Sequence, residues 1–332
     1  MEIKRPYLLF LGDAADPLAA KVAQGIKDWR PENAVGQFRL EGCKADLGLE
    51  DMTIEQAVKA GCKTMVIGVA NRGGVISDAW IRVLIDALEN GMDLAAGLHN
   101  KLADIPELVA IADRLERKLF DVRHPTETYP VATGKNRTGK RLLPVGTDCS
   151  CGKMYTALAI EKEMRARAMK ADFRATGQTG ILITGSGVSI DAVAADFISG
   201  SVETISPDNE PDHWDLIEGQ GSLYHASFAG VTAGLIHGAQ ADALVLCHEP
   251  TRTHMRGLPQ YPIPSMQSVM DMALHMAQLT NKDAKFVGIC VNTSNLSDDE
   301  AEKYLQETEE KFDMPCVDPV RNGVGRIVDV LQ

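Results

Sequence analysis

Residues 145–153 read Val-Gly-Thr-Asp-Cys-Ser-Cys-Gly-Lys. The apolar run 142–146 leads into this stretch and predicts a strand, and the segment 153–169 that follows predicts a long helix. In such a loop, glycines let backbone N–H groups converge on an anion, the helix adds its positive end, and a lysine supplies a charge. The stretch therefore predicts a P-loop that binds an anionic, phosphate-bearing ligand.

Two features separate this loop from the common Walker A loop. Five residues lie between Gly146 and Gly152, where the common loop has four, and Met154 stands where Ser or Thr normally binds Mg²⁺. Without that hydroxyl, we expect the loop to hold phosphates without cleaving them, and we expect no tightly bound metal. The candidate cofactor-binding residues are Gly146, Thr147, Asp148, Cys149, Ser150, Cys151, Gly152, Lys153, Met154, Tyr155 and Thr156.

The rest of the C-terminal part continues the alternation of strands and helices. A capping box of Ser297 and Glu300 marks the start of one of these helices. The expected strands are 181–184, 214–218, 243–247 and 285–291, and the expected helices are 266–279 and 298–312. The pattern predicts a P-loop NTPase-like domain built on a parallel sheet.

The N-terminal part shows the same alternation. Ser77 is placed to cap a helix that Gly91 ends. The expected strands are 7–11, 64–69, 93–98 and 118–122. This pattern predicts a Rossmann-like domain, so the whole chain is α/β. The segment 125–141 is polar and rich in turn residues, which places the boundary between domains 1–135 and 136–332.

Composition restricts the class of protein. The chain is 45% hydrophobic and 24% charged, as soluble globular proteins are. Its net charge of -12 repels polyanions, so nucleic acid is not an expected partner. The seven cysteines are odd in number and scattered, which predicts free thiols in a reducing compartment, the cytoplasm. No apolar stretch approaches the ~20 residues of a membrane span, and the run after Arg5 is too short for a signal peptide.

Polar clusters after other expected elements supply further candidate residues. Glu218 follows a buried strand, where a carboxylate acts as a general base or as a metal ligand. Arginines bind carboxylates and phosphates bidentately, so an acidic substrate and a cofactor phosphate both remain open as their ligands. The candidate catalytic residues are Glu218 and Asp191, and the candidate substrate-binding residues are Thr176, Gln178, Gln220, Arg252 and Arg256.

Four motifs together resemble the DgcN-like family, formerly a domain of unknown function. They are Gly-Thr-Asp-Cys-x-x-Gly-Lys-Met at 146–154, Thr-Gly-Gln-Thr-Gly at 176–180, Glu-Gly-Gln-Gly-Ser at 218–222 and Gly-Leu-His at 97–99. The resemblance covers nearly the whole chain and implies a D-glutamate N-acetyltransferase that uses acetyl-CoA. Met154 agrees with the family, and Tyr155 replaces its more usual Thr. Enzymes of this type are usually symmetric homo-oligomers.

Two other functions remain open from the residues. One is an ATP- and Mg²⁺-dependent ligase or kinase of the dethiobiotin-synthetase type, in which Glu218 binds the metal and Lys153 the β- and γ-phosphates. The other is a nucleotide- or CoA-sensing protein without catalysis. Titration with each nucleotide and a turnover assay distinguish the three.

Overall fold

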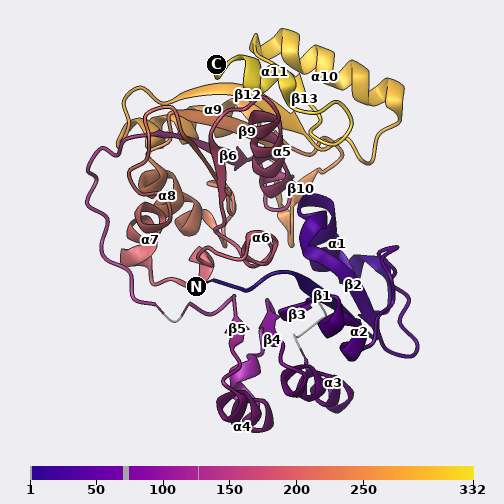
Figure 1. Ribbon diagram of the computed structural model, residues 1–332. Coiled ribbons are helices and arrows are strands. Elements are labelled where there is room, and N and C mark those ends of the chain that lie inside the picture. Colours follow the sequence, from indigo (N-terminus) through magenta and orange to yellow (C-terminus); the bar gives the residue numbers. More distant parts are fainter. Residues whose placement is uncertain (1, 70–74, 126) are drawn as a thin grey trace. The chain divides into compact units, whose positions relative to one another are not determined.

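The computed structural model describes residues 2–69, 75–125 and 127–332, which divide into two units (Figure 1). The first unit contains Met1–Glu127 together with Gly177–Ala192. The second contains Thr128–Thr176 and Val193–Gln332. Residues 128–135, which the sequence analysis placed in the N-terminal domain, thus belong to the second unit. Within the described ranges, no helix has the length and apolar character that crossing a membrane requires.

The first unit is built on a parallel five-stranded sheet with the order β2-β1-β3-β4-β5. Its strands are β1 (Tyr7–Gly12), β2 (Ala34–Arg39), β3 (Thr64–Ile67), β4 (Asp93–Ala96) and β5 (Leu119–Asp121). Its helices are α1 (Lys21–Trp29), α2 (Ile54–Lys59), α3 (Asp78–Glu89), α4 (Pro106–Leu115) and α6 (Gln178–Thr184). Every residue of β1 is buried, because this strand lies inside the sheet and helices cover it. This is the Rossmann-like architecture that the N-terminal pattern predicted.

The second unit is built on a parallel six-stranded sheet with the order β13-β12-β9-β6-β8-β7. Its strands are β6 (Lys140–Gly146), β7 (Ala171–Arg174), β8 (Trp214–Ile217), β9 (Ala243–His248), β12 (Lys285–Val291) and β13 (Cys316–Val317), and β10 (His254–Met255) and β11 (Leu258–Pro262) form a separate antiparallel hairpin. Its helices are α5 (Lys153–Ala166), α7 (Ile198–Ile205), α8 (Ala229–Ala239), α9 (Met266–Gln278), α10 (Asp298–Phe312) and α11 (Gly325–Asp329).

The strand order explains which helices share a face of this second sheet. From β6 the chain crosses through α5 to β7, at one edge of the sheet. From β8 it later crosses back through α8, past β6, to β9, which is the opposite direction along the sheet. Because βαβ crossovers are right-handed, opposite directions place their helices on opposite faces. Figure 1 shows α5 on one side of the sheet, and α7 and α8 together on the other. The loop after β6 is therefore a topological switch point, where α/β proteins bind ligands.

The segment 181–184 is a helix, and the sequence-based prediction of a strand there was wrong. Gly177 precedes the helix in an extended conformation, and Gly185 ends it with φ +82°. Ile181 to Ile183 are all buried, and an apolar run this short is compatible with a strand or a helix. The helix packs against α1 of the first unit, where Gly25 lies close to the Ile183 side chain. The inserted segment Gly177–Ala192 thus completes the first unit.

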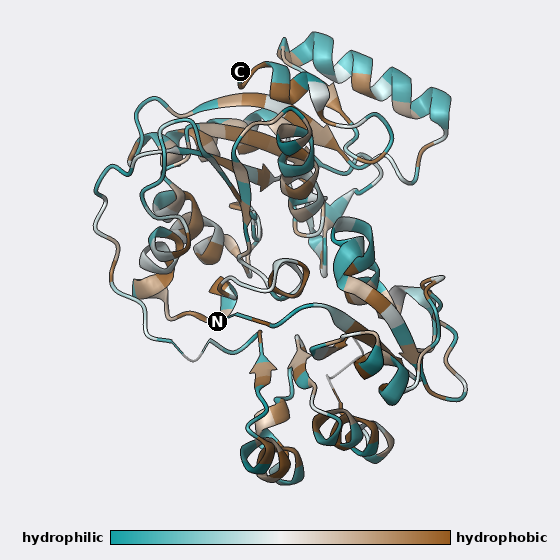
Figure 2. Cartoon of the chain, viewed as in Figure 1, coloured by the Kyte–Doolittle hydropathy of each residue, from teal (hydrophilic) through white to brown (hydrophobic). Residues whose placement is uncertain are grey.

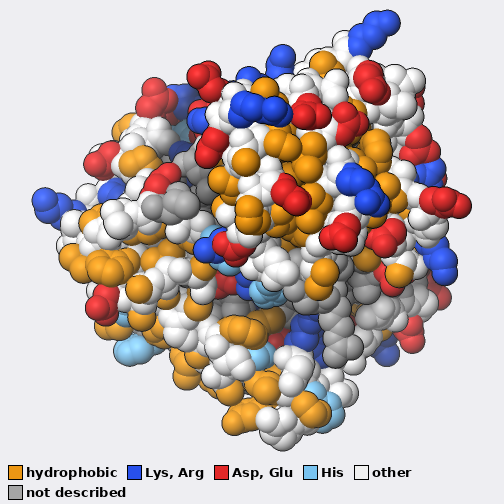
Figure 3. All heavy atoms as spheres, turned by 90° about the horizontal axis from the view of Figure 1, so that it is seen from below, with side chains coloured by type: hydrophobic (Ala, Val, Ile, Leu, Met, Phe, Trp, Pro, Cys, Tyr) orange, Lys and Arg blue, Asp and Glu red, His pale blue; other side chains and the backbone are white. Residues whose placement is uncertain are grey.

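Hydropathy and charge follow the same organisation. Figure 2 shows α10 hydrophilic over most of its length, and only Ala301, Leu305 and Thr308 of this helix are buried. On the face drawn in Figure 3, Lys and Arg side chains lie dispersed among acidic ones. All seven cysteines are free thiols, and five of them are buried.

Candidate phosphate-binding site

The loop from Gly146 to Gly152 connects a central strand to the first turn of α5. β6 lies between β9 and β8, and the N–H of Thr147 donates to the carbonyl of Cys247 at 3.1 Å, which extends the pairing past the strand. Ser150 and Gly152 have φ of +52° and +108°, so the loop turns back twice before the helix begins. The expected strand, loop and helix are thus confirmed, and the loop has the context of a phosphate-binding loop.

Lys153 is the first residue of α5, and its side chain folds back over the loop. It is only 5% exposed, and its Nζ donates to the Asp148 carbonyl oxygen at 2.7 Å. A Cβ on Gly146 would lie 3.0 Å from this Nζ and 2.5 Å from Cys151 Sγ, so only glycine leaves room there. The ammonium group therefore stays inside the loop, where it adds to the positive end of the helix.

Two arginines after β9 hold the first half of the loop. Arg252 Nη1 donates to Asp148 Oδ2 at 2.6 Å and to the Cys149 carbonyl at 2.6 Å, and its Nη2 donates to the Ser150 carbonyl at 3.2 Å. The N–H of Arg256 donates to Asp148 Oδ2 at 2.9 Å, and its guanidinium donates to Ser150 Oγ. Burial lowers the pKa of Arg252, but the hydrogen bond and charge of Asp148 outweigh it, so the pKa is raised. Substrate binding by these arginines stays a prediction; their observed contacts hold the loop.

The edge of β7 and β8 brings Thr176 and Glu218 together. Glu218 Oε2 accepts from the Thr176 N–H at 2.9 Å, and Thr176 Oγ1 donates to the Glu218 carbonyl at 2.7 Å. Both residues are buried. A Cβ on the next residue, Gly219, would lie 3.0 Å from Lys153 Cδ, so the Glu218 segment runs directly beside the lysine. Gln220 follows, and its carbonyl accepts from Thr232 Oγ1 at 2.9 Å.

The Thr156 side chain is buried inside the second unit. It is 1% exposed, and Cys247 Sγ lies 3.3 Å from its Oγ1. Met154 and Tyr155 are half-buried on the same helix. A phosphate contact from the Thr156 hydroxyl stays a prediction.

Gln178 and Asp191 lie in the first unit, gathered around Arg123. The guanidinium donates to Gln178 Oε1 at 2.8 Å and to Asp191 Oδ2 at 3.1 Å, and Ser189 Oγ donates to Asp191 Oδ1 at 2.9 Å. The structure thus joins Thr176, Glu218 and the P-loop within one unit, and Gln178 and Asp191 within the other.

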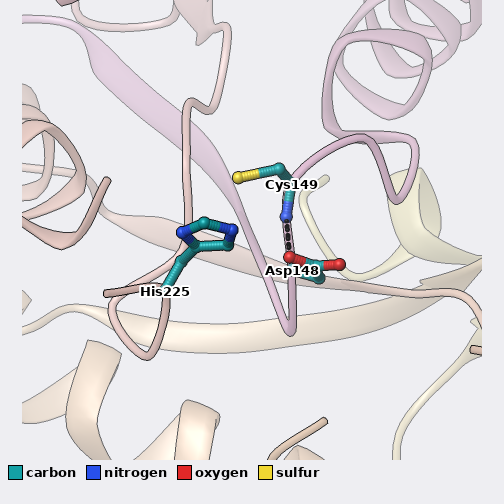
Figure 4. A group of neighbouring side chains, drawn as sticks. All are labelled: Asp148, Cys149 and His225. Atoms are coloured by element: carbon teal, nitrogen blue, oxygen red, sulfur yellow. Dashed lines mark hydrogen bonds between the residues drawn. The ribbon is translucent and has the colours of Figure 1, made fainter. Parts of the chain in front are cut away.

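Two histidines beside the loop were not among the candidate site residues. His248, the last residue of β9, hydrogen-bonds Thr147 Oγ1 through Nδ1 at 2.9 Å. His225 follows β8 and lies close to Asp148 and Cys149 (Figure 4). The sequence around His225 matches no motif that predicts a ligand contact, because only the fold brings this segment to the loop.

We expect His248 to make the folded state less stable in acid. Burial lowers the pKa of His248 to about 4, with Glu249 acting to raise it and Arg252 to lower it. Below pH 6.5 the unfolded chain binds a proton that the folded chain does not, so this contribution is complete above pH 6.5 and is lost as the pH falls toward 4. Between pH 7 and 5 the loss is about 2 kcal/mol in the free energy of unfolding.

Urea titrations at pH 7 and pH 5 measure this loss. His248→Gln keeps a side chain that can hydrogen-bond Thr147 but does not titrate, so its stability should fall less between the two pH values. The exposed His254 provides the matched control, His254→Gln, whose pH dependence should equal that of the unmodified protein. Equal losses in all three proteins would contradict the assignment to His248.

Comparison with known protein families gives two matches along the chain. Residues 130–328 match a domain of unknown function described as the P-loop domain of DUF1611, and residues 38–125 match the Rossmann-like domain described as its N-terminal part. A crystal structure of a DUF1611 family protein from Anabaena variabilis superposes with a TM-score of 0.83 at 31% identity, covering 99% of both chains.

Two curated proteins are similar over their full length. One, named D-glutamate N-acetyltransferase, comes from Tritonibacter scottomollicae and is 63% identical over 329 residues, 99% of each chain. The other has the same name, comes from a Pseudoalteromonas species and is 51% identical over 328 residues, again 99% of each chain.

Proposed function

This chain belongs to the DUF1611 family, and we propose that it is a D-glutamate N-acetyltransferase, an acyltransferase that moves an acetyl group from acetyl-CoA to the amine of D-glutamate. Full-length identity of 63% and 51% to proteins of that name supports the proposal. In the structure, the observation that carries it is a P-loop whose Lys153 is buried and whose Met154 replaces the Ser or Thr that normally binds Mg²⁺. Such a loop suits a ligand whose phosphates are bound but not cleaved.

The P-loop is the proposed site for the phosphates of CoA. CoA carries a pyrophosphate and a 3′-phosphate, which require N–H donors and positive charge. Loop residues other than Thr147 and Cys149, whose N–H groups already donate within the protein, supply the backbone donors, Lys153 supplies the charge, and Arg252 holds the loop in shape. Arg256 is exposed beside Ser150, so its guanidinium is free on one side to reach a phosphate or a substrate carboxylate.

Acetyl transfer needs a deprotonated amine and a stabilised oxyanion. We assign proton removal to Glu218 and the oxyanion contact to backbone N–H groups near Gly219. The pantetheine arm of CoA spans roughly 15–20 Å when extended, by standard bond lengths. Because Glu218 lies beside Lys153, this assignment requires the arm to fold back toward the loop. Asp191 of the first unit is the second candidate base.

Replacing Glu218 by Gln tests the function and the base together. With acetyl-CoA and D-glutamate, the unmodified protein should release the CoA thiol and form N-acetyl-D-glutamate. Glu218→Gln should lower kcat by about 100-fold or more, because general-base catalysis contributes that much, while acetyl-CoA affinity stays the same. The amide oxygen of Gln can still accept from Thr176, so the fold is expected to persist.

The same assay separates the possible failures. Unchanged kcat in Glu218→Gln would remove Glu218 from the mechanism, and Asp191→Asn would then be the next variant. A loss of acetyl-CoA affinity in place of kcat would assign Glu218 to the phosphate site. Absence of product with the unmodified protein, with L-glutamate tested in parallel, would overturn the proposed reaction.

We also place the protein in the cytoplasm as a homo-oligomer. The seven free thiols are typical of a reducing compartment, and enzymes of this kind usually form closed symmetric assemblies. Light scattering on the purified protein measures the assembly directly.

A further inference from the structure

Three side chains of the second unit meet at the P-loop, two of them from the loop itself, and the proposed reaction assigns no chemical step to these side chains. Asp148, Cys149 and His225 each offer one metal-ligating atom, and these atoms lie within 4.8 Å of one another. Asp148 and His225 are buried, and Cys149 is half-buried. In Figure 4, the Cys149 side chain extends from the loop toward the His225 imidazole. The three come from two segments that are distant in sequence, so no local ligand spacing reveals the cluster.

The Asp148 carboxylate is oriented and retains a lone pair for a further ligand. Its Oδ2 accepts from Arg252 Nη1 at 2.6 Å and from the Arg256 N–H at 2.9 Å, which fills that oxygen. Its Oδ1 accepts only the Cys149 N–H, at 2.7 Å, among the bonds found in the described residues. A carboxylate oxygen has two lone pairs, so Oδ1 can bind a cation while Oδ2 remains fixed.

The His225 ring is held at both nitrogens. Nε2 donates to the Arg256 carbonyl at 3.0 Å, and Nδ1 accepts from the Ser227 N–H at 3.2 Å. The ring also packs on Phe228, with centroids 4.7 Å apart. A metal bound to Nδ1 would replace the hydrogen bond from Ser227. Nε2 would keep its hydrogen bond to the Arg256 carbonyl, which holds the ring in place. A backbone carbonyl in this second role is typical of metal-binding histidines.

The donor set selects the kind of metal. A thiolate, an imidazole and a carboxylate together suit Zn²⁺, whereas Mg²⁺ requires oxygen ligands. Ionised Asp148 and Cys149 bring two negative charges to Zn²⁺. The Arg252 cation that pairs with Asp148 at 2.6 Å is offset by Glu249 at 3.3 Å, and Lys153 and Arg256 add positive charge near Cys149. Three protein ligands leave a fourth position open, as in catalytic zinc sites.

From this geometry we propose that Asp148, Cys149 and His225 form a Zn²⁺ site next to the P-loop, with its fourth position open to water or to a ligand oxygen. Binding converts the Cys149 thiol to a thiolate and releases its proton to solvent. The proposed Zn²⁺ site is independent of the identity of the acetyl acceptor.

Cobalt substitution of the full-length protein tests the site directly. After dialysis against a chelator, titration with Co²⁺ should produce a near-ultraviolet thiolate-to-cobalt charge-transfer band that saturates at one metal per chain. Zn²⁺ should abolish the band by displacement. Calorimetry with Zn²⁺ should give a larger affinity loss in Cys149→Ser and His225→Gln than the roughly 10–100-fold that loss of an outer-sphere partner costs.

Cys43→Ser is the matched control, because Cys43 is a half-buried thiol of the first unit, outside the cluster. It should leave Zn²⁺ affinity unchanged. If a ligand variant fails to fold, alkylation of the unmodified protein decides: Zn²⁺ should protect Cys149 from iodoacetamide, as peptide mass mapping measures. A cobalt spectrum without the thiolate band, or alkylation of Cys149 at the same rate with and without Zn²⁺, would overturn the proposal.

Discussion

Lys153→Ala should lose acetyl-CoA binding by about 100-fold or more in isothermal titration calorimetry. A charged hydrogen bond contributes about 1.5–3 kcal/mol, which corresponds to roughly 10- to 150-fold in affinity. The buried Lys153 ammonium also closes the loop through the Asp148 carbonyl, so its removal takes away both the charge and part of the loop's shape. The two losses add, which places the expected effect near the upper end of that range.

A second lysine of the same helix provides the control. Lys162 is exposed on α5, so Lys162→Ala changes the net charge equally but leaves the loop untouched. It should bind acetyl-CoA as the unmodified protein does. Equal affinity in Lys153→Ala and Lys162→Ala would contradict the assignment of the P-loop to CoA.

Titration of the unmodified protein with ATP and Mg²⁺ separates the enzyme classes. The acetyltransferase proposal expects binding of acetyl-CoA and none of Mg-ATP, because Met154 supplies no hydroxyl to the metal. Tight Mg-ATP binding without acetyl-CoA binding would favour a ligase or kinase instead. Lys153 would then hold β- and γ-phosphates, as in other P-loop enzymes.

The fold was predictable from the sequence wherever an element carried a complete local signal. α10 begins and ends where its capping box and periodicity placed it, and β12 matches the apolar run 285–291. In contrast, the edge strands β2 and β7 were missed, because each mixes polar with apolar residues. Their pairing with a neighbouring strand, not their own pattern, makes them strands.

The candidate site was predictable in its loop but not in its surroundings. The P-loop has a spacing and a context that reveal its chemistry within a few residues. The roles of Arg252 and His225 depend on contacts with residues more than 70 positions away. A single sequence carries no record of such contacts. For the same reason, the contacts of Asp191 with Arg123 in the first unit followed from the fold and not from the motif around 176–187.

The largest expected loss of stability comes from a single methyl group at Gly219. A Cβ at this position would lie 1.9 Å from the Pro144 carbonyl oxygen and 3.0 Å from Lys153 Cδ. The Pro144 carbonyl is backbone of the central strand β6, so it cannot move aside without disturbing the sheet. Overpacking typically costs 1–3 kcal/mol, and contact with rigid backbone places Gly219→Ala at about 3 kcal/mol or more in the free energy of unfolding.

Gly230→Ala isolates this steric effect from the general effect of replacing glycine. Gly230 lies in α8, and a Cβ there would meet nothing within 4 Å. Alanine in a helix is favoured over glycine by up to about 1 kcal/mol, so this variant should be equally or more stable in urea titrations. Gly219→Ala should also weaken acetyl-CoA binding, because relief of the clash displaces either β8 or Lys153. A Gly219→Ala protein as stable as Gly230→Ala would show that the Glu218 segment does not pack against the P-loop as described, and the proposed roles of Glu218 and Lys153 would then lose their shared geometric basis.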